Sequence, residues 1–547
     1  MARRYDAVVF DLGDVLFHWD PSVVTALPKT KFRAMMTTTI WSDFDRGFLS
    51  AEEAYKLLAK EVNTTPELVR EALEQAQKTL YPDPEMTNLI LKLGSARMWP
   101  GQPRVHVFGL SNITKVHFES TQKAEFPWHL FDRIVTSCGT GMRKPGLGIY
   151  QFLLREAGID PSRTIFLDDK AENVFAARSL GLRGELVGRL GPERSKLVAL
   201  MTNLLLPNTT AIRAEGFLRS RAGRHFSEMD GGGIINDNFS QLLIYGLTGL
   251  EELICLGWPT GSYSPALPPT PPATVHGSIA DSDSDGVLTP PISDDERQQA
   301  TLSNSDLWNY YAAPHPQHAT SSFPPDADTT SIAYLSLAEP HLRALPSPAL
   351  VLNAMLSNIN GDGIMQVYFD SSRPRVCPVV CVNMLRLFSM FSTTSIDTSP
   401  GLAPTIDFVV SSLANRAYIY GCRYYIPDAF LYFCALLHSE CKPTAPVLWQ
   451  RLDAHMRPTL VEQLGTLAEG DNAMALAMRI RACQVAGVDK AMVMNEFEQL
   501  LRLQNAEDGG WPAGCFCKFG KTGKDVGNRG LTTAVVWRVL KEYDGWQ

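Results

Sequence analysis

At 547 residues the chain is too long for one compact hydrophobic core, so we expect two to four domains. Hydrophobic residues make up 45% of the sequence and charged residues 20%, as is typical of soluble globular proteins. The net charge of −8 argues against the basic face of a nucleic-acid-binding protein, and no nucleic-acid partner is expected.

The apolar stretches predict a cytoplasmic protein without stable membrane insertion. The N-terminal "MARRYDAVVFDLGDVLF" predicts a core strand rather than a signal peptide, because Asp6, Asp11 and Asp14 interrupt its apolar run. The later "FSQLLIYGLTGLEELICLGW" contains Glu251 and Glu252 and predicts a buried helix. Ten scattered cysteines without paired C-x-x-C sets favour buried thiols in a reducing cytosol. Whether the chain forms a homo-oligomer stays open.

Residues 1–205 alternate short apolar runs with helical segments. Four of the runs end in small or polar residues: "DAVVFDLG", "RVHVFGLSN", "FDRIVTS" and "RTIFLDD". This alternation predicts an α/β domain whose parallel sheet carries its chemistry at the carboxyl ends of the strands. Between the first two runs, residues of about 17–100 predict a helical insert.

From residue 206 to residue 547 helical periodicity dominates, and this half is rich in aromatic residues. It predicts an all-α domain. Within it, residues 259–303 are rich in Pro, Ser and Asp and poor in large apolar side chains, which predicts a disordered insert.

Reactive side chains follow the predicted strands of the first domain in a fixed order. Phosphate-ester cleavage needs a carboxylate nucleophile, groups that hold phosphate oxygens, and acidic metal ligands. The residues of these types are Asp11, Ser111, Asn112, Lys144, Asp168 and Asp169.

This order resembles the haloacid-dehalogenase-like (HAD) phosphatases, in which the helical insert would be the cap. The resemblance implies that Asp11 is the nucleophile and a Mg²⁺ ligand. It also implies that Ser111, Asn112 and Lys144 bind phosphate, and that Asp168 and Asp169 complete the metal site. The "DDKAE" at 168–172 also matches the DDxxE motif of ionising terpene synthases, but that motif belongs on a helix.

The sequence departs from the HAD pattern at Gly13, where the family usually has a second Asp as general acid. Asp14 lies one residue further and, because strand side chains alternate, it does not simply replace residue 13. The loss matters little when a phosphate leaves, and more when an alkoxide must be protonated. Phosphatase activity is therefore still expected.

The segment "DADTT" at 326–330 has two readings. Asp and Thr are ordinary helix-start residues. The segment also resembles the acid motif of class II terpene cyclases, which implies that Asp328 protonates an alkene with support from Asp326, Thr329 and Thr330. Burial would keep such a carboxyl protonated. The "SIDTS" at 395–399 is a weaker echo, for which a helix cap is the preferred interpretation.

A carbocation needs an apolar cavity with aromatic faces, and its diphosphate needs cations. Each aromatic residue could equally be plain core, and each cation a solvated surface charge. The aromatic candidates are Trp308, Tyr310, Tyr311, Tyr334, Tyr368, Phe369, Tyr418, Tyr420, Tyr424 and Tyr425. The cationic candidates are Arg373, Arg375, Arg423, Lys518, Lys521, Lys524 and Arg529, with Arg529 favoured. In addition, "QNAEDGGW" resembles a helix-end motif of triterpene and diterpene cyclases.

Together the two halves resemble the microbial HAD-like drimane-type sesquiterpene synthases, the drimenol and albicanol synthase group. The resemblance implies an α/β HAD-like domain with a Rossmann-like parallel sheet and helical cap, joined to an α/α-barrel cyclase domain of the β type. It also implies cyclisation of farnesyl diphosphate followed by Mg²⁺-dependent dephosphorylation to a drimane alcohol, of the drimenol or the albicanol type. Two alternatives remain: a cyclase with a degenerate HAD domain, or a phosphatase whose helical half binds a ligand or partner.

Overall fold

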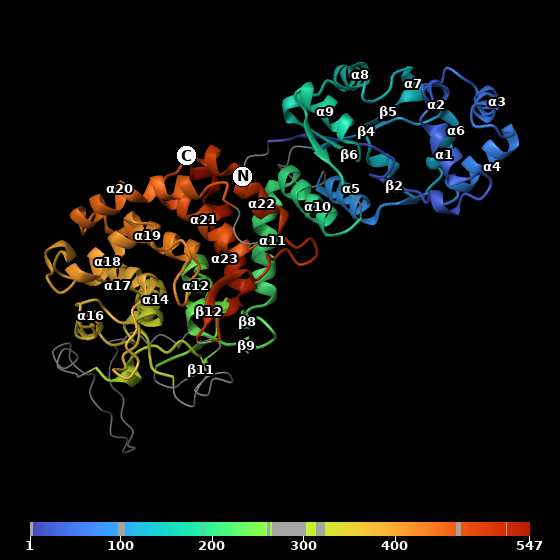
Figure 1. The fold of residues 1–547 in the computed structure, drawn as a ribbon. Helices are drawn as coiled ribbons and strands as arrows, with labels where there is room; N and C mark the ends of the chain where they lie inside the picture. Colours follow the sequence, from blue (N-terminus) through green and yellow to red (C-terminus); the bar gives the residue numbers. More distant parts are fainter. Residues whose placement is uncertain are drawn as a thin grey trace, which may run out of the picture. The chain divides into compact units, whose positions relative to one another are not determined.

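The computed structural model describes residues 4–96, 104–188, 190–259, 263–264, 302–312, 323–466, 472–520 and 522–546. Most of the insert predicted at 259–303 lies outside the described residues, as does Lys521. The chain divides into two compact units, Met1–Thr209 and Thr210–Gln547 (Figure 1). Within the described residues, no helix combines the length and apolar character needed to cross a membrane.

The first unit is built on a five-stranded parallel sheet in the order β5-β4-β1-β6-β7. The strands are β1 (Ala7–Phe10), β4 (His106–Ser111), β5 (Arg133–Thr136), β6 (Thr164–Asp168) and β7 (Arg183–Leu186). The helices that follow them are α6 (Lys115–Thr121), α7 (Ser137–Thr140), α8 (Leu147–Ala157), α9 (Ala171–Ser179) and α10 (Pro192–Leu205). Strands β1 and β6 are buried along their whole length, as expected when helices cover both faces of a sheet. The predicted parallel sheet is confirmed.

The predicted helical insert is a small cap with its own hydrophobic core. It contains α1 (Lys29–Met36), α2 (Thr39–Asp45), α3 (Ala51–Glu61) and α4 (Pro66–Gln77). The sequence specifies the helix starts, since Ser50 and Glu53 form a capping box before α3 and Thr65 caps α4. The short strands β2 (Phe17–His18) and β3 (Tyr81–Pro82) pair at its base, and α5 (Pro84–Ala96) packs on α10.

The second unit is a barrel of helices within helices. Six inner helices form a closed ring in which each packs on the next and the last packs on the first. They are α12 (Asn238–Thr248), α14 (Ala327–Ser336), α17 (Pro378–Phe391), α19 (Pro427–Cys441), α21 (Ala473–Val485) and α23 (Arg529–Lys541). The other helices are α11 (Pro207–Ser220), α15 (Glu339–Leu342), α16 (Pro348–Ser357), α18 (Ala403–Ala414), α20 (Pro446–Gln463) and α22 (Lys490–Arg502). Helix α14 is buried on every side from Ala327 to Tyr334, as an inner helix must be. The predicted helical barrel is confirmed.

A small antiparallel sheet adds to the helical unit and was not predicted. Its order is β12-β13-β8-β9, with β8 (Ser227–Met229), β9 (Ile234–Ile235), β12 (Cys515–Phe519) and β13 (Lys524–Gly527). A further pair is β10 (Leu256–Gly257) with β11 (Tyr263–Ser264). Strands β8, β9 and β13 are only two to four residues long, too short to give a clear alternating pattern. Residues of β12 and β13 nevertheless line the cavity described below.

Candidate active sites

In the first unit, the carboxyl ends of three adjacent strands bring the predicted phosphatase residues together. Asp11 follows β1, Ser111 ends β4 and Asp168 ends β6, and β1 lies between the other two strands. A cavity of about 300 Å³ opens at this edge and is lined by Asp11, Ser111, Asn112, Lys144 and Asp169 among others. This is the edge at which ligands bind to open parallel sheets.

Lys144 is the buried cation of this site. Its Nζ lies 2.9 Å from Asp11 Oδ1 and 2.6 Å from Asp168 Oδ2. Burial alone lowers the pKa of Lys144, but the charges of the two carboxylates outweigh it and raise the pKa above its ordinary value. Asn112 holds the Lys144 backbone with two hydrogen bonds of 2.8 Å, one donated by its Nδ2 and one accepted by its Oδ1. In this structure Asn112 therefore positions Lys144.

Asp11, Asp168 and Asp169 form a group that fits a divalent cation. Each offers a carboxylate oxygen, and these oxygens lie within 4.8 Å of one another. Asp168 is further oriented because its Oδ1 accepts hydrogen bonds of 2.9 Å from Lys170 N and from Asn173 Nδ2. Hard carboxylate ligands of this kind suit Mg²⁺. Since Asp168 ends a strand, "DDKAE" does not have the helical setting of the terpene synthase motif.

The position of the missing general acid is open space. A Cβ atom added at Gly13 would meet nothing within 4 Å, and Gly13 lines the cavity. Asp14 also lines the cavity, with its backbone in the left-handed region at a φ of 55°. Its carboxylate is about half exposed and lies 3.9 Å from His18 Nδ1.

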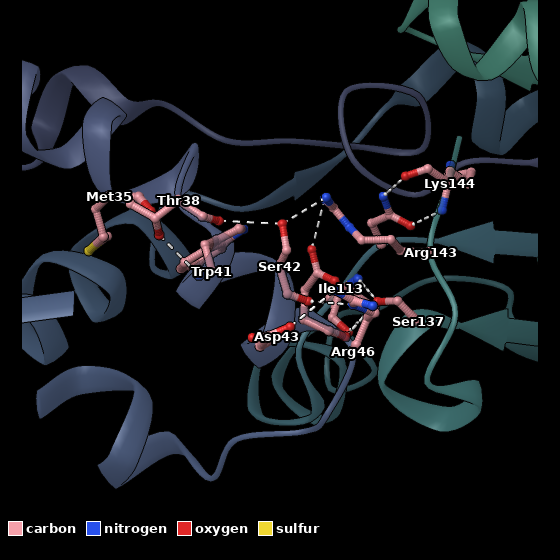
Figure 2. A network of polar contacts seen from close by, with 12 residues as sticks. Met35, Thr38, Trp41, Ser42, Asp43, Arg46, Ile113, Ser137, Arg143 and Lys144 are labelled. Carbon is pink, nitrogen blue, oxygen red and sulfur yellow. Dashed lines mark hydrogen bonds and ion pairs between the residues drawn. The ribbon is translucent and has the colours of Figure 1, made fainter. Parts of the chain in front are cut away.

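Arg143, which sequence analysis missed, ties the cap to the sheet domain (Figure 2). Its Nη1 donates to Ser42 Oγ at 2.9 Å, and its Nη2 lies 3.0 Å from Asp45 Oδ2. Ser137 Oγ donates to the backbone oxygen of Asp45 at 2.6 Å and accepts from Ile113 N at 2.9 Å. Helix α2 is therefore held directly beside Lys144.

In the second unit, the two aspartates of "DADTT" have different roles. Asp326 is the N-cap of α14, and its two carboxylate oxygens accept from Thr329 N at 2.6 Å and Thr329 Oγ1 at 2.9 Å. The helix-start reading therefore holds for Asp326. Thr330 Oγ1 accepts a hydrogen bond from Trp308 N at 3.1 Å. Both threonines therefore fix the position of the segment through hydrogen bonds within the protein.

Asp328 is buried and held by two hydrogen-bond donors. Tyr425 OH donates to its Oδ2 at 2.5 Å, and Asn383 Nδ2 donates to its Oδ1 at 2.8 Å. Arg386 Nη1 in turn donates to Asn383 Oδ1 at 3.1 Å, while the rest of the guanidinium makes a bidentate pair with Glu440. Burial raises the pKa of Asp328 to about 6 although both donors act to lower it. The result is an acid with fixed geometry whose pKa lies much closer to neutral pH than that of an ordinary aspartate.

Burial likewise raises the pKa of Asp326 to about 7. Two ionised carboxylates side by side in a buried site would repel each other, so partial protonation of Asp326 limits the negative charge beside Asp328.

Both aspartates line a cavity of about 420 Å³ whose walls include several aromatic side chains. Its aromatic lining comprises Tyr310, Tyr311, Phe323, Tyr368, Tyr424, Tyr425 and Phe519. Five of the aromatic candidates are among them, whereas Trp308 is fully buried and Tyr420 is exposed to solvent. A cavity of this kind can stabilise a carbocation through ring faces while excluding water.

Two of the predicted cations line this cavity, namely Arg373 and Lys518. Arg373 also stacks over the Phe323 ring at 5.6 Å and lies 3.5 Å from Asp370. Arg375 is exposed and donates to the backbone oxygen of Pro374. Of the cationic candidates that the structure describes, Arg373 and Lys518 are the two that line the cavity.

Arg529, the favoured candidate, is not among the lining residues of the cavity. Its guanidinium makes a bidentate pair with Asp508 at 2.9 and 3.0 Å, and its Nε donates to Trp511 O at 3.1 Å. Trp511 and Gln504 belong to "QNAEDGGW", and their side chains donate to Leu500 O and Gly509 O. This segment therefore ties the end of α22 to the start of α23, and Arg529 is part of that tie.

Asn383 and Arg386 belong to the hydrogen-bond network around Asp328 and were missed by sequence analysis. They lie one turn apart on α17 and are the polar interruptions in the apolar run "CVNMLRLF". This polar interruption of an apolar helical run is the signal from which sequence analysis could have found the two residues. The weaker echo "SIDTS" is a helix cap, because Asp397 accepts from Val447 N and Leu448 N at the start of α20, both at 2.9 Å.

Comparison with known proteins gives matches to both units. Residues 211–391 match the family of the sesquiterpene cyclase astC-like C-terminal domain. The drimenol cyclase drtB of Aspergillus calidoustus is 31% identical over 539 residues, covering 98% of this chain and 87% of drtB. The sesquiterpene phosphatase astK of Aspergillus oryzae is 33% identical over 184 residues, covering 34% of this chain and 90% of astK.

Two further matches concern the first unit. A D-ribitol-5-phosphate phosphatase of Bacteroides thetaiotaomicron is 27% identical over 188 residues, covering 32% of this chain and 87% of that enzyme. A crystal structure of a HAD family enzyme from the same organism aligns with a TM-score of 0.29 and 22% identity, covering 34% of this chain and 95% of that one.

Proposed function

The chain belongs to the family of HAD-like drimane-type sesquiterpene synthases, and from this premise we propose that it cyclises farnesyl diphosphate and then dephosphorylates the product. The helical unit forms a drimane-type bicyclic diphosphate, and the HAD-like unit converts it to a drimane alcohol. The observation that carries the proposal is Asp328, a buried carboxyl held by Tyr425 and Asn383 at the wall of an aromatic cavity.

Cyclisation begins with proton transfer from the Asp328 carboxyl to the terminal alkene of the substrate. An alkene is a very weak base, so the acid must be neutral beforehand and its conjugate base stabilised afterwards. Burial supplies the first condition, and hydrogen bonds from Tyr425 and Asn383 supply the second. Two ring closures give a bicyclic cation, which loses a proton. Water then reprotonates Asp328, and the substrate is isomerised with its diphosphate intact.

The aromatic lining of the cavity faces the positive charge as it moves through the ring closures. Arg373 and Lys518 are the cations that would hold the diphosphate, since both line the same cavity. The allylic C–O bond is not ionised in a reaction that starts by protonation. The diphosphate therefore survives as a substrate for the other site.

Dephosphorylation uses Asp11 as nucleophile. Its carboxylate forms a bond to phosphorus as the P–O bond to the leaving group breaks, and water then hydrolyses the aspartyl phosphate to release inorganic phosphate. Ser111 and Lys144 would hold the phosphoryl oxygens. Mg²⁺ held by Asp11, Asp168 and Asp169 would neutralise charge on the transferred group. With Gly13 in place of an acid, the alkoxide that leaves when the second phosphate is transferred to Asp11 relies on water for its proton.

The test is incubation of the full chain with farnesyl diphosphate and Mg²⁺, followed by mass spectrometry of the products. A bicyclic alcohol is the expected result. Bicyclic diphosphate alone would indicate a cyclase with an inactive HAD-like unit, and farnesol without ring products would indicate a phosphatase with a helical binding unit. Asp328→Ala is expected to abolish ring formation, and normal cyclisation by this variant would refute the proton-donor role.

A further inference from the structure

Two cysteine thiols of the helical unit lie in contact and take no part in the proposed chemistry. Cys377 Sγ and Cys422 Sγ are 3.3 Å apart, although the two residues are 45 positions apart in sequence. Cys377 is the N-cap residue of α17 and is buried, whereas Cys422 lies in the loop before α19 and is partly exposed to solvent. A disulfide bond is about 2 Å long, so the two sulfur atoms need only a small further approach to bond.

The surroundings of the two thiols make them chemically different. Hydrogen bonds from Cys377 and from the backbone N–H groups of Tyr424 and Tyr425 lower the pKa of Cys422 to about 7, although burial opposes them. Burial raises the pKa of Cys377 instead. Cys422 is therefore the thiol with the larger thiolate fraction and the one that a small oxidant reaches from solvent. Cys377 is placed to attack it afterwards.

Both cysteines belong to the segments that hold Asp328. Helix α17, which begins directly after Cys377, carries Asn383, and the loop of Cys422 carries Tyr425. Tyr425 N donates to Cys422 Sγ at 3.3 Å, and Cys422 N donates to Tyr425 O at 2.9 Å. The sulfur of Cys422 thus helps to fix the backbone of the residue whose hydroxyl donates to the acid.

The turn around Cys422 has little room to absorb a displacement of its sulfur. Gly421 has a φ of 71°, and a Cβ atom added there would lie 2.6 Å from Tyr425 O. Tyr424 O accepts a hydrogen bond of 2.6 Å from Lys518 N in β12, whose residues line the cavity. Drawing the Cys422 sulfur toward its partner thiol therefore pulls on Tyr425 and displaces the tyrosine hydroxyl from the acid.

We propose that Cys377 and Cys422 are an oxidation site whose reversible disulfide bond switches cyclisation off. The oxidant is a hydroperoxide, of which hydrogen peroxide is the simplest. This inference rests on the proposed function, since it assigns regulation to the cyclase site. It gives a role to two thiols that the proton transfer does not use.

The oxidation proceeds in two steps. The Cys422 thiolate attacks a peroxide oxygen, so that an S–O bond forms while the O–O bond breaks, and the departing hydroxide takes up a proton. Cys377 Sγ then attacks Cys422 Sγ, the S–S bond forms, the S–O bond breaks, and the hydroxide leaves as water with a thiol proton. Two electrons and two protons pass from the thiols to hydrogen peroxide, which becomes two waters.

The test treats the reduced full chain with hydrogen peroxide, blocks the remaining thiols by alkylation, and analyses an unreduced tryptic digest by mass spectrometry. We expect peptide 376–386 joined to peptide 417–423. Cyclisation of farnesyl diphosphate should fall by about 10- to 100-fold, because small displacements of catalytic groups have effects of this size. Dithiothreitol should restore the rate to within about twofold, since thiol exchange reverses the bond. Phosphate release from drimanyl monophosphate should not change, because neither cysteine belongs to the first unit.

Single substitutions identify the bonded pair. Cys377→Ser and Cys422→Ser each remove one partner, and each variant should cyclise at the same rate before and after peroxide. Peptide 376–386 also contains Cys381, so loss of the joined peptide in Cys377→Ser shows which of its thiols is bonded. Cys138→Ser removes a partly exposed thiol of the first unit and is the matched control, which should remain sensitive to peroxide.

Absence of the joined peptide would overturn the proposal, as would a disulfide that leaves cyclisation unchanged or a loss of rate that persists in Cys377→Ser. An equal loss of phosphate release would also overturn it, because the oxidation would then act on the whole protein. If the reduced protein forms no bicyclic product, the proposed function itself is overturned, and the joined peptide would still establish the oxidation site.

Discussion

Gly13→Asp is expected to accelerate one chemical step of the phosphatase and leave the other unchanged. Gly13 lines the cavity, an added Cβ meets nothing within 4 Å, and the residue is not among the glycines with a left-handed backbone. An aspartate therefore fits without strain. When the terminal phosphate of a diphosphate is removed, the leaving group is itself a phosphate ester and departs without a proton. When the second phosphate is removed, an alkoxide must be protonated.

General acid catalysis typically contributes about 10²–10⁴-fold. We take the lower end, because an introduced acid lacks the surroundings of an evolved one. Gly13→Asp should then raise phosphate release from drimanyl monophosphate by about 100-fold, or about 2.7 kcal/mol of barrier. Release of the first phosphate from drimanyl diphosphate should change by less than about threefold by the same reasoning.

The assay is single-turnover phosphate release from each ester separately, with the full chain and Mg²⁺. Gly13→Asn is the matched control, since it has the same size but no proton to give. Equal acceleration by the Asn variant, or equal acceleration of both steps by the Asp variant, would refute the leaving-group argument. A loss of rate on both esters would show that position 13 does not tolerate a side chain.

Three further outcomes are expected. Burial raises the pKa of Asp328 to about 6, and the protonated form is the active one. The cyclisation rate should therefore fall about tenfold per pH unit as pH rises above about 7. A rate that increases with pH would contradict this expectation. Asn383→Leu removes the donor to Asp328 Oδ1 and should lower cyclisation by about 10- to 100-fold while shifting the pH midpoint upward, measured as bicyclic product at saturating substrate. Asp11→Asn should accumulate bicyclic diphosphate with cyclisation within about twofold of wild type, and chelation of divalent cations should stop phosphate release in the wild type.

The parts of the structure that were predictable from sequence depend on local patterns. Apolar runs ending in Asp11, Ser111 and Asp168 revealed both the parallel sheet and its reactive edge, because a strand and its terminal residue are contiguous in sequence. Helical periodicity likewise revealed the all-α second half, whereas its barrel architecture was implied by the family resemblance. The "DADTT" segment gave the helix cap at Asp326 and, in the first turn of α14, the proposed acid Asp328.

What could not be predicted depends on contacts between distant residues. The donors to Asp328 lie 55 and 97 residues away, on or before other inner helices, and only the closed ring brings them together. An arginine that binds diphosphate and one that ties a loop look alike in sequence. Arg529 meets Asp508 because the loop that follows α22 lies against the start of α23, and that contact has no local signal. The same holds for Arg143, whose partners belong to the cap.

The measurement that tests the central claim most directly is the reaction of farnesyl diphosphate in D₂O. If Asp328 starts the reaction by giving up a solvent-exchanged proton, the bicyclic product carries one deuterium, on the ring methylene beside the geminal dimethyl carbon. Asp328→Asn should then give no bicyclic product. A bicyclic product without deuterium at that carbon would contradict the account, because the reaction would have started without protonation of the alkene.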